Sequence, residues 1–226
     1  MFNGQLQIGD RVYAPWRRER LFSARITYLT NGTATIAYDD GETDRMPARR
    51  LQRSNKVFII ESVSRRPMES TWSEGRILSD FLRMIGGRPM YTFIRTKVEL
   101  GHFFKQARLS ASPYIHLSMH GLREKLVLQL EEVDIAEVIA AAGDLSGKVV
   151  FSSSCLTGHA AFGRAFVQGT GAMAFISPRR EIRWADGALV SQLFYKKLLC
   201  DGVSPSVAYR FVRKTYRGHA DLRYFG

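Results

Sequence analysis

Two residues that can act together in nucleophilic catalysis end two predicted strands of this sequence. The segment YIHLSMHG (residues 114–121) ends in His120 and Gly121, and KVVFSSSC (residues 148–155) ends in Cys155. A free thiol has a pKa of about 8.5 and is mostly protonated at neutral pH, whereas a thiol beside an imidazole becomes a better nucleophile. We therefore predict that Cys155 attacks a peptide carbonyl. His120 serves as its base and later protonates the departing amine.

The same two strand ends also supply donors for the negative oxygen that forms during such an attack. A backbone N–H at a glycine can approach this oxygen closely, because no side chain stands in the way. Gly121 directly follows His120. We predict an oxyanion hole made of the Gly121 N–H and the Cys155 N–H.

Neighbouring parallel strands are the elements that would bring these residues together. From Lys56 onward, short apolar runs alternate with amphipathic helical segments, which predicts an α/β fold with a mostly parallel sheet sandwiched by helices. Functional groups in such sheets collect beyond the carboxyl ends of the strands. The expected strands are 56–62, 90–95, 114–121, 148–155 and 172–177, and the expected helices are 74–87, 97–108, 131–143, 160–169, 184–199 and 204–216. Residues 123–130 alternate in polarity and predict a β-ribbon.

In the first fifty residues, apolar and polar residues alternate with a different period from that of the rest of the chain. Short alternating runs are separated by turn residues, with Asn31–Gly32 as a strong hairpin signal and Asp40–Gly41 as a second turn. Four or five short strands without a helical period predict a small all-β barrel. Residues 50–55 (RLQRSN) lose the strand pattern and are expected to form a short linker.

This first segment resembles a Tudor-like domain, in the runs GDRVYAPW, FSARITYL and ATIAYDDGETDRMP. The resemblance implies a partner-binding module, whose ligand is a modified peptide or nucleic acid. Ring faces attract cations, so a methylated side chain could enter an aromatic cage. Its candidate walls are Tyr13, Trp16, Phe22 and Tyr38. The alternative is that most of these rings are barrel core.

Three arginines close to this candidate cage argue for a different ligand. They are Arg17, Arg18 and Arg20. Their positive charge would repel a methylated cation, so an acidic or phosphate-bearing partner fits the module better. The ligand of the first segment therefore stays open.

Composition limits the other classes of function. The 226 residues have a net charge of +12, which attracts nucleic acid, anionic membranes or acidic proteins without choosing among them. Two cysteines cannot make a disulfide framework, and their spacing suggests no zinc site. No phosphate-binding loop is present, and no cofactor or metal is expected. Without a long apolar span or a leader, we expect a soluble cytoplasmic protein that does not insert into membranes.

The chain from residue 56 onward resembles the caspase-like CHAT peptidases, relatives of caspases, legumain and separase. The resemblance rests on HLSMHG, on VVFSSSCLTG and on the later run RWADGALVSQLFYKKLLCDGVSPSVAYRFVRKTY. Whereas the separate resemblance of the first segment implies a Tudor-like barrel over 1–53, this resemblance implies a peptidase domain over 56–226. It also implies His120 as base and general acid, and Cys155 as nucleophile. CHAT peptidases of bacteria often act in antiviral or other defence systems, where they cut a protein encoded nearby.

The substrate pocket is less well defined by the sequence. Ser153 and Ser154 precede the cysteine, where caspases carry a glutamine and legumain-type enzymes a glutamate that helps to read the substrate. Ser153 is expected to line the substrate pocket, but its side chain does not indicate which substrate residue the pocket accepts. Relatives that cut after arginine or lysine place a carboxylate in the pocket. Asp186 or Glu61 could supply it, or either could be a surface acid or a helix cap.

Other histidines and the second cysteine compete with these assignments. His159 would share a helical face with Cys155 if a helix began near the cysteine, because the two are four residues apart. We favour His120, which has its glycine and the resemblance. His116, inside its strand, is expected to be packed, and Cys200, at the end of an apolar helix, is expected to be inert.

Two functions from different classes follow. The first is a cysteine endopeptidase (a thiol protease) that hydrolyses a protein substrate, with a Cys155 thiol of lowered pKa that reacts with iodoacetamide well below pH 8. The alternative is a catalytically silent binding protein that recognises a modified peptide or nucleic acid through its first segment. A structural thiol would not show this reactivity.

Overall fold

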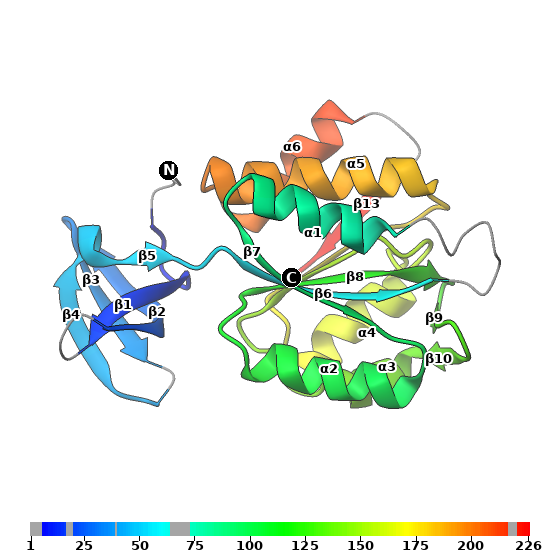
Figure 1. The fold of residues 1–226 in the computed structure, drawn as a ribbon, viewed down its shortest axis with the longest axis horizontal. Helices are drawn as coiled ribbons and strands as arrows, with labels where there is room; N and C mark the ends of the chain where they lie inside the picture. The colour runs from blue at the N-terminus through cyan, green and yellow to red at the C-terminus, as the bar shows by residue number, and fades with distance from the viewer. Residues whose placement is uncertain (1–5, 17–19, 39, 64–72, 217–220) are drawn as a thin grey trace.

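The computed structural model describes residues 6–16, 20–38, 40–63, 73–216 and 221–226, which form two separate sheets (Figure 1). The first sheet is antiparallel and curled, with strand order β4-β3-β2-β1-β5. Its strands are β1 (Arg11–Trp16), β2 (Arg20–Thr30), β3 (Thr33–Tyr38), β4 (Thr43–Pro47) and β5 (Gln52–Arg53), with a 3-10 turn at Ala48–Arg50.

The predicted hairpin turn joins β2 to β3. Asn31 and Gly32 have φ angles of 42° and 77°, the left-handed values that a two-residue hairpin turn demands, and Thr30 pairs with Thr33 across it. Small and branched side chains such as Ala24, Ile26 and Ile36 fill the inner face. The sheet differs from the expected barrel in one respect. Among the described residues β4 and β5 do not pair, so the ladder stays open, and β5 lies within the expected linker.

The second sheet is mostly parallel, as expected from the alternation of strands and helices. Parallel strands run in the order β7-β6-β8-β11-β12, and β13 adds an antiparallel edge beside β12. Their bounds are β6 (Lys56–Ser62), β7 (Arg88–Phe93), β8 (Tyr114–Gly121), β11 (Val149–Ser152), β12 (Ala174–Pro178) and β13 (Leu222–Phe225). The sequence pattern did not predict β13, which follows the last helix.

Helices cover both faces of this sheet, so the central strands are apolar on both sides (Figure 1). One face packs against α1 (Glu74–Met84), α5 (Trp184–Tyr195) with its π-helical extension Lys196–Cys200, and α6 (Pro205–Thr215). The other packs against α2 (Lys97–Leu109), α3 (Ile135–Ala142) and α4 (Ala160–Thr170). Neighbours along β8 alternate between the two cores: Ile115 and Leu117 pack with α2 and α3, and Tyr114 packs with α5.

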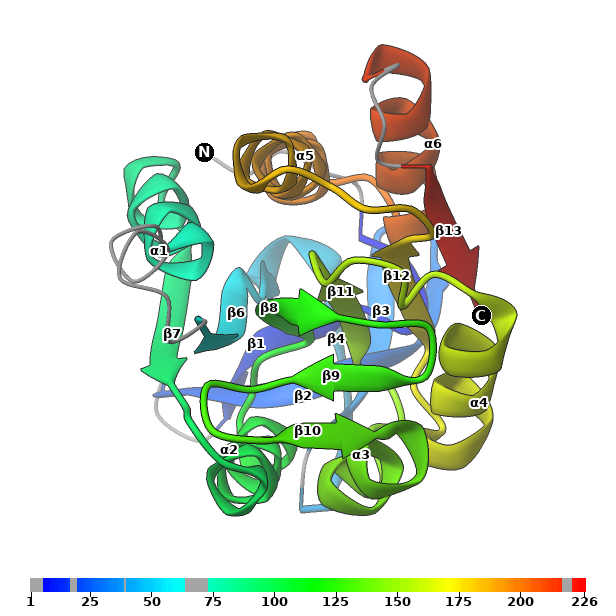
Figure 2. The ribbon, with the colours of Figure 1, turned by 90° about the vertical axis from the view of Figure 1, so that its right-hand side faces the viewer.

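The β-ribbon expected after His120 extends the sheet at the carboxyl end of β8. It consists of β9 (Lys125–Val127) and β10 (Glu132–Asp134). His120 and Gly121 pair with Val127 and Leu126 of β9 (Figure 2). The ribbon therefore fixes the backbone of the residues that we predicted to be catalytic.

Candidate active site

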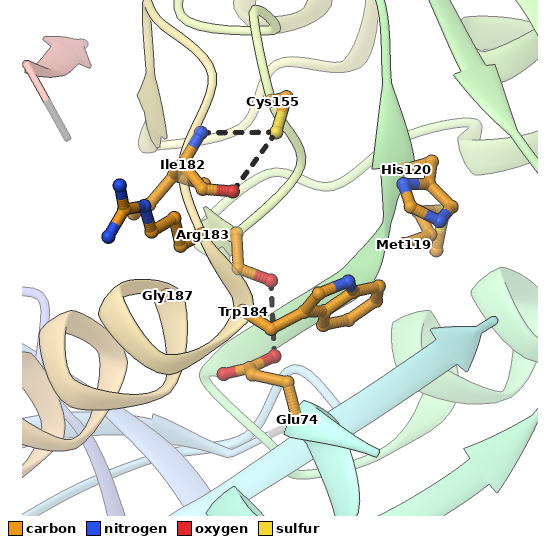
Figure 3. Close-up of a pocket in the computed structure, with 9 residues that line it drawn as sticks. Glu74, Met119, His120, Cys155, Ile182, Arg183, Trp184 and Gly187 are labelled. Atoms are coloured by element: carbon orange, nitrogen blue, oxygen red, sulfur yellow. Dashed lines mark hydrogen bonds between the residues drawn. The ribbon is translucent and has the colours of Figure 1, made fainter. Parts of the chain in front are cut away.

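His120 and Cys155 line the same cavity, of about 60 Å³. His120 is next to last in β8, and Cys155 lies three residues beyond the end of β11. Met119 of β8 and Ser153, which follows β11, line it as well. The remaining lining residues come from α1, the loop after β12 and the start of α5 (Figure 3): Glu74, Ile182, Arg183, Trp184 and Gly187. The structure thus brings together the two residues that the sequence predicted as a pair.

The parallel pairing of β8 with β11 explains this placement. The register runs from Tyr114 beside Val149 to Leu117 beside Ser152, and the Ser153 N–H then donates to the Leu117 carbonyl at 2.9 Å. The chain beyond β11 therefore follows β8 past the end of the regular strand. It is still beside β8 when it reaches the cysteine.

Gly121 is required where the two strand ends meet. A Cβ atom at this position would lie 2.5 Å from the Cys155 carbonyl oxygen and 2.9 Å from the Ser154 Cβ. Backbone atoms cannot yield at such distances, so only glycine fits. Gly121 and Cys155, which we predicted to form the oxyanion hole, are therefore in direct contact.

A tight turn holds Cys155 in place. Leu156 adopts a φ of 64°, which is uncommon outside glycine, and the Thr157 N–H donates to the Cys155 carbonyl at 2.8 Å. Gly158 donates from its N–H to the Pro178 carbonyl at 2.9 Å, which ties the turn to the end of β12. Strained backbone of this kind persists only where surrounding contacts determine it, and it often marks functional sites.

The Cys155 thiol itself hydrogen-bonds to the backbone of Ile182. The Ile182 N–H donates to Sγ at 3.3 Å, and the thiol donates to the Ile182 carbonyl at 3.6 Å (Figure 3). Burial raises the pKa of the thiol, and the charge of Glu181 raises it further. The hydrogen bond from Ile182 only partly opposes them. The expected lowered pKa is therefore wrong for the arrangement in this structure.

The raised pKa predicts a slow reaction of the resting thiol with iodoacetamide. The thiolate is the reactive form, and its fraction grows as the pH rises through the pKa. At pH 7, Cys155 should be alkylated more slowly than glutathione, and the midpoint of its pH–rate profile should lie above that of a free cysteine. Glu181→Gln should move the midpoint down, since it removes a nearby negative charge. Mass spectrometry of Cys155 alkylation across a pH series measures this, and a midpoint below that of glutathione would refute it.

Trp184 contacts His120 from the start of α5. The ring centroids are 5.3 Å apart with an interplanar angle of 80°, an edge-to-face arrangement. Together with the pairing of His120 to Val127, this contact restricts where the imidazole can turn. Trp184 was not among the predicted site residues, although it belongs to the run that resembles CHAT peptidases.

The other histidines that the sequence offered, His116 and His159, do not line this cavity. His159 precedes the first residue of α4, so Cys155 is not in that helix and the two do not share a helical face. His159 lines a different cavity, together with Arg123, Arg179 and Arg180. His116 is fully buried, as expected, and its Nε2 lies 3.0 Å from a Glu74 carboxylate oxygen.

Neither of the two expected pocket carboxylates is among the described residues that line the cavity. Glu61 is fully buried and accepts hydrogen bonds from the Gly75 N–H at 2.8 Å, the Tyr91 hydroxyl at 2.8 Å and the Ser118 hydroxyl at 3.1 Å. Asp186 accepts a hydrogen bond from the Tyr216 hydroxyl at 2.5 Å. Both carboxylates hold elements of the fold together. Ser153, the third residue expected in the pocket, does line the cavity.

A carboxylate that was not predicted from the sequence takes the place of these two. Glu74, the first residue of α1, lines the cavity and is only 3% exposed. Its oxygens accept hydrogen bonds from His116 Nε2 at 3.0 Å, the Ser153 hydroxyl at 3.1 Å and the Ser191 hydroxyl at 2.6 Å. An acidic residue in the first turn of a helix is so common that its type and position gave no signal.

Burial alone would raise the pKa of Glu74, but its neighbours more than reverse this effect. The charge and hydrogen bond of His116, followed by hydrogen bonds of Ser118 and Ser191, lower the pKa to about 2. Glu74 is therefore ionised throughout the neutral range. It places a negative charge in the wall of the cavity that His120 and Cys155 also line.

The candidate aromatic cage is not assembled by its described members. Tyr38 is 6% exposed, and its hydroxyl donates to the Pro15 carbonyl at 3.1 Å. Phe22 is 47% exposed and pairs with buried Ala14 across β1 and β2. Successive side chains of a strand point to opposite faces, so Tyr13 lies on the other face of β1 from Ala14. There the Lys56 amino group lies 5.1 Å from the centre of the Tyr13 ring. Arg17 and Arg18, and the side chains of Trp16 and Arg20, lie outside the described part of the chain.

Comparisons with known proteins add no assignment, because no family model and no curated protein matches the sequence. The described residues contain no group of three or more His, Cys, Asp or Glu side chains that could hold a metal ion. None of the helices in the described ranges is long and apolar enough to cross a membrane.

Proposed function

We propose that the protein is a cysteine endopeptidase with a caspase-like domain, in which Cys155 is the nucleophile and His120 the base and general acid. One observation supports this above all. His120 and Cys155 come from the ends of neighbouring parallel strands and line one cavity, with Gly121 in contact with Cys155. The resemblance of HLSMHG and VVFSSSCLTG to the catalytic motifs of CHAT peptidases supports the same assignment.

In the first half of the reaction, the thiol proton passes to the His120 ring as Sγ bonds to the substrate carbonyl carbon. The carbonyl π electrons move to the oxygen, and N–H groups of Gly121 and Cys155 stabilise its negative charge. As the carbonyl re-forms, the carbon–nitrogen bond breaks and His120 donates its proton to the departing amine. The acyl group of the substrate then remains on Sγ as a thioester.

Water completes the reaction. His120 accepts a proton from the water molecule as its oxygen attacks the thioester carbonyl carbon. When the carbon–sulfur bond breaks, the thiolate recovers this proton from His120, and the carboxylic acid product leaves. The enzyme returns to its starting state, and the net reaction is hydrolysis of one peptide bond.

The Cys155 thiol is hydrogen-bonded to Ile182, so the proposed enzyme is in a resting state in this structure. The thiol donates toward the Ile182 carbonyl, so its proton is not yet directed to His120. Rotation of the Cys155 side chain away from Ile182 would direct it there. Because the pKa of the thiol is raised, proton transfer to His120 accompanies the attack rather than preceding it.

The second candidate function is a binding protein without catalytic activity. The observation in its favour is the same contact, because a buried thiol held by backbone groups is typical of an inert cysteine. In this case the first sheet, which resembles a Tudor-like domain, would bind the partner. The two candidates differ in whether any peptide is cut.

A peptide library tests the proposed function across many substrate sequences at once. Incubation of the full chain with peptides from a digested proteome should generate new termini at defined positions, detected by mass spectrometry. Alkylation of the protein beforehand at high pH, where the thiolate is available, should remove this activity. A library left intact by the untreated protein would favour the binding protein instead.

A further inference from the structure

The outer strand β7 of the second sheet has one open edge. Among the described residues it pairs with β6 alone, in parallel. Figure 2 shows β7 at the side of the sheet, below α1. The unpaired backbone groups of an edge strand can pair with another chain unless charges, proline or a covering segment prevent it.

Two backbone hydrogen bonds show which groups of β7 face the open side. The Arg88 N–H donates to the carbonyl of the residue before β6 at 3.2 Å, and the Ile94 N–H donates to the Glu61 carbonyl at 2.8 Å. The backbone groups of successive strand residues point to alternate sides, so the odd-numbered residues between these two face outward. Tyr91 and Phe93 therefore each present an N–H and a carbonyl to the open side.

Pro89 narrows this open edge without closing it. It faces outward like Tyr91 and Phe93, but it offers only a carbonyl, because proline has no N–H. Within the described part of the chain, these outward groups have no hydrogen-bond partner. An extended peptide laid along β7 would satisfy them together, as in strand addition to other sheet edges.

Apolar side chains border the open edge on both faces of the sheet. Met90, Tyr91 and Phe93 are 42%, 36% and 39% exposed. Met90 lies beside Phe58 and Tyr91 beside Ile59 in the strand register, and Phe58 and Ile59 belong to the cores on opposite faces. An added strand would therefore find apolar cross-strand neighbours on each face.

Two exposed arginines give this edge a positive charge. Arg88 begins β7, and Arg76 lies in the first turn of α1. Burial is the main cause that raises the pKa of Tyr91 to about 12, and the charge of Arg76 is among the effects that oppose this rise. Arg76 is thus close to the open strand. Neither arginine forms an ion pair with a described carboxylate.

The acidic residues near β7 are already engaged. Asp80 pairs with Arg83 at 2.8 Å, and Glu99 pairs with Arg95 at 3.6 Å. Glu61 is fully buried and accepts hydrogen bonds within the fold. The charge that remains available to a partner at this edge is therefore positive.

We propose that the open edge of β7 binds an extended acidic segment of a partner protein, which joins the sheet as an additional strand. The backbone of this segment pairs with Pro89, Tyr91 and Phe93, and its acidic side chains meet Arg76 and Arg88. None of these five residues lines the cavity of the candidate active site. The inference therefore does not depend on the proposed peptidase function.

A second copy of this chain fits the edge less well than an acidic partner. Two identical edges pair antiparallel about a two-fold axis, so the start of one strand lies beside the end of the other. Arg88 begins the strand, and Arg76 acts on Tyr91 in its second half. Such a dimer would bring the positive charges of both copies together, which is unfavourable.

A phage-displayed library of random peptides about ten residues long, enough to span the strand, supplies the probe. The full chain should select peptides in which acidic and apolar residues alternate. Synthetic copies of these peptides should bind in fluorescence anisotropy measurements, and more weakly as salt is added. Hydrogen exchange of the Tyr91 and Phe93 amides should slow in the complex, because both N–H groups become paired.

Arg88→Glu tests the contribution of charge to this binding. The variant should bind the selected peptides at least about tenfold more weakly, because an attractive charge becomes repulsive. Arg164→Glu is the matched control, since Arg164 is exposed on α4, away from β7, and the variant should keep the affinity.

Phe93→Pro tests the contribution of the backbone. It removes the outward N–H, whereas Phe93→Ala removes the ring and keeps the N–H. The proline variant should bind at least about fivefold more weakly than the alanine variant, as expected for the loss of a hydrogen bond. Proline is tolerated on sheet edges, and thermal melting checks that each variant is folded. Arg88→Glu decides the matter if the proline variant is not.

Three results would overturn the proposal. The first is a library that yields no binding peptide or yields basic ones. The second is selected peptides whose affinity is unchanged by both Arg88→Glu and a folded Phe93→Pro variant, which would place their site elsewhere. The third is a natural chain that dimerises in analytical ultracentrifugation while Phe93→Pro stays monomeric, which would assign the edge to a second copy.

Discussion

Cys155→Ala should lower kcat/KM for peptide cleavage by at least about 10³-fold, because no other group can form the thioester. The fold should survive, since the change removes one sulfur atom from a half-buried position at the edge of the cavity. Steady-state kinetics on a peptide cut by the natural chain measure the loss. The melting temperature should change by only a few degrees, as removal of a single small contact implies.

Cys200→Ala is the matched control for this substitution. Cys200 is the other free cysteine, and it ends the π-helical extension of α5 rather than lining the cavity. Its loss should leave kcat/KM within about twofold of the natural value, as expected for a residue outside the reacting groups. If Cys155→Ala retains activity in a folded protein, the nucleophile has been assigned to the wrong residue.

His120→Ala should lower kcat/KM by about 10²- to 10⁴-fold, the range expected when a general acid–base group is lost. The thiol would then keep its proton at neutral pH, because its pKa is raised. The activity that remains should rise with pH as the thiolate forms without help from a base. A pH–rate profile of the variant, compared with that of the natural chain, measures both effects.

His159→Ala is the matched control for His120→Ala. His159 lies beside the start of α4 and lines a separate cavity, so its removal should spare most of the activity. The reverse result, with His159→Ala inactive and His120→Ala active, would transfer the role of base to His159. Such a result would also require a movement of the turn at residues 155–158, because Cys155 and His159 do not lie on one helix in this structure.

Strong local periodicity explains why most of the second sheet could be predicted. The apolar run 56–62 and the segment 114–121 coincide with β6 and β8, and Ser204 caps α6 by accepting from the Val207 N–H. The Asn31–Gly32 turn was equally clear, because few residue pairs tolerate its φ angles. In contrast, β13 is short and lies on the edge of the sheet, where pairing with β12 rather than its own sequence pattern defines it.

Only the part of the site that follows from the order of the strands could be predicted from the sequence. The meeting of His120, Gly121 and Cys155 follows from two strand ends, but the thiol pKa depends on a backbone contact with Ile182 that no local pattern encodes. Glu74 enters the cavity through packing of α1 against the end of the sheet, which is likewise a tertiary effect. The aromatic residues of the first sheet were misleading, because Tyr38 serves the core and Tyr13 faces the other way.

A decisive test of the catalytic assignment is to identify the residue that a substrate-like electrophile modifies. The full chain is treated at pH 7 with peptidyl acyloxymethyl ketones that vary in the residue beside the ketone, and its tryptic peptides are then analysed by mass spectrometry. We predict one covalent adduct, on Cys155 in the peptide spanning residues 149–164, and its loss in His120→Ala. Equal modification of Cys200, or an adduct on Cys155 that does not depend on His120, would contradict the assignment.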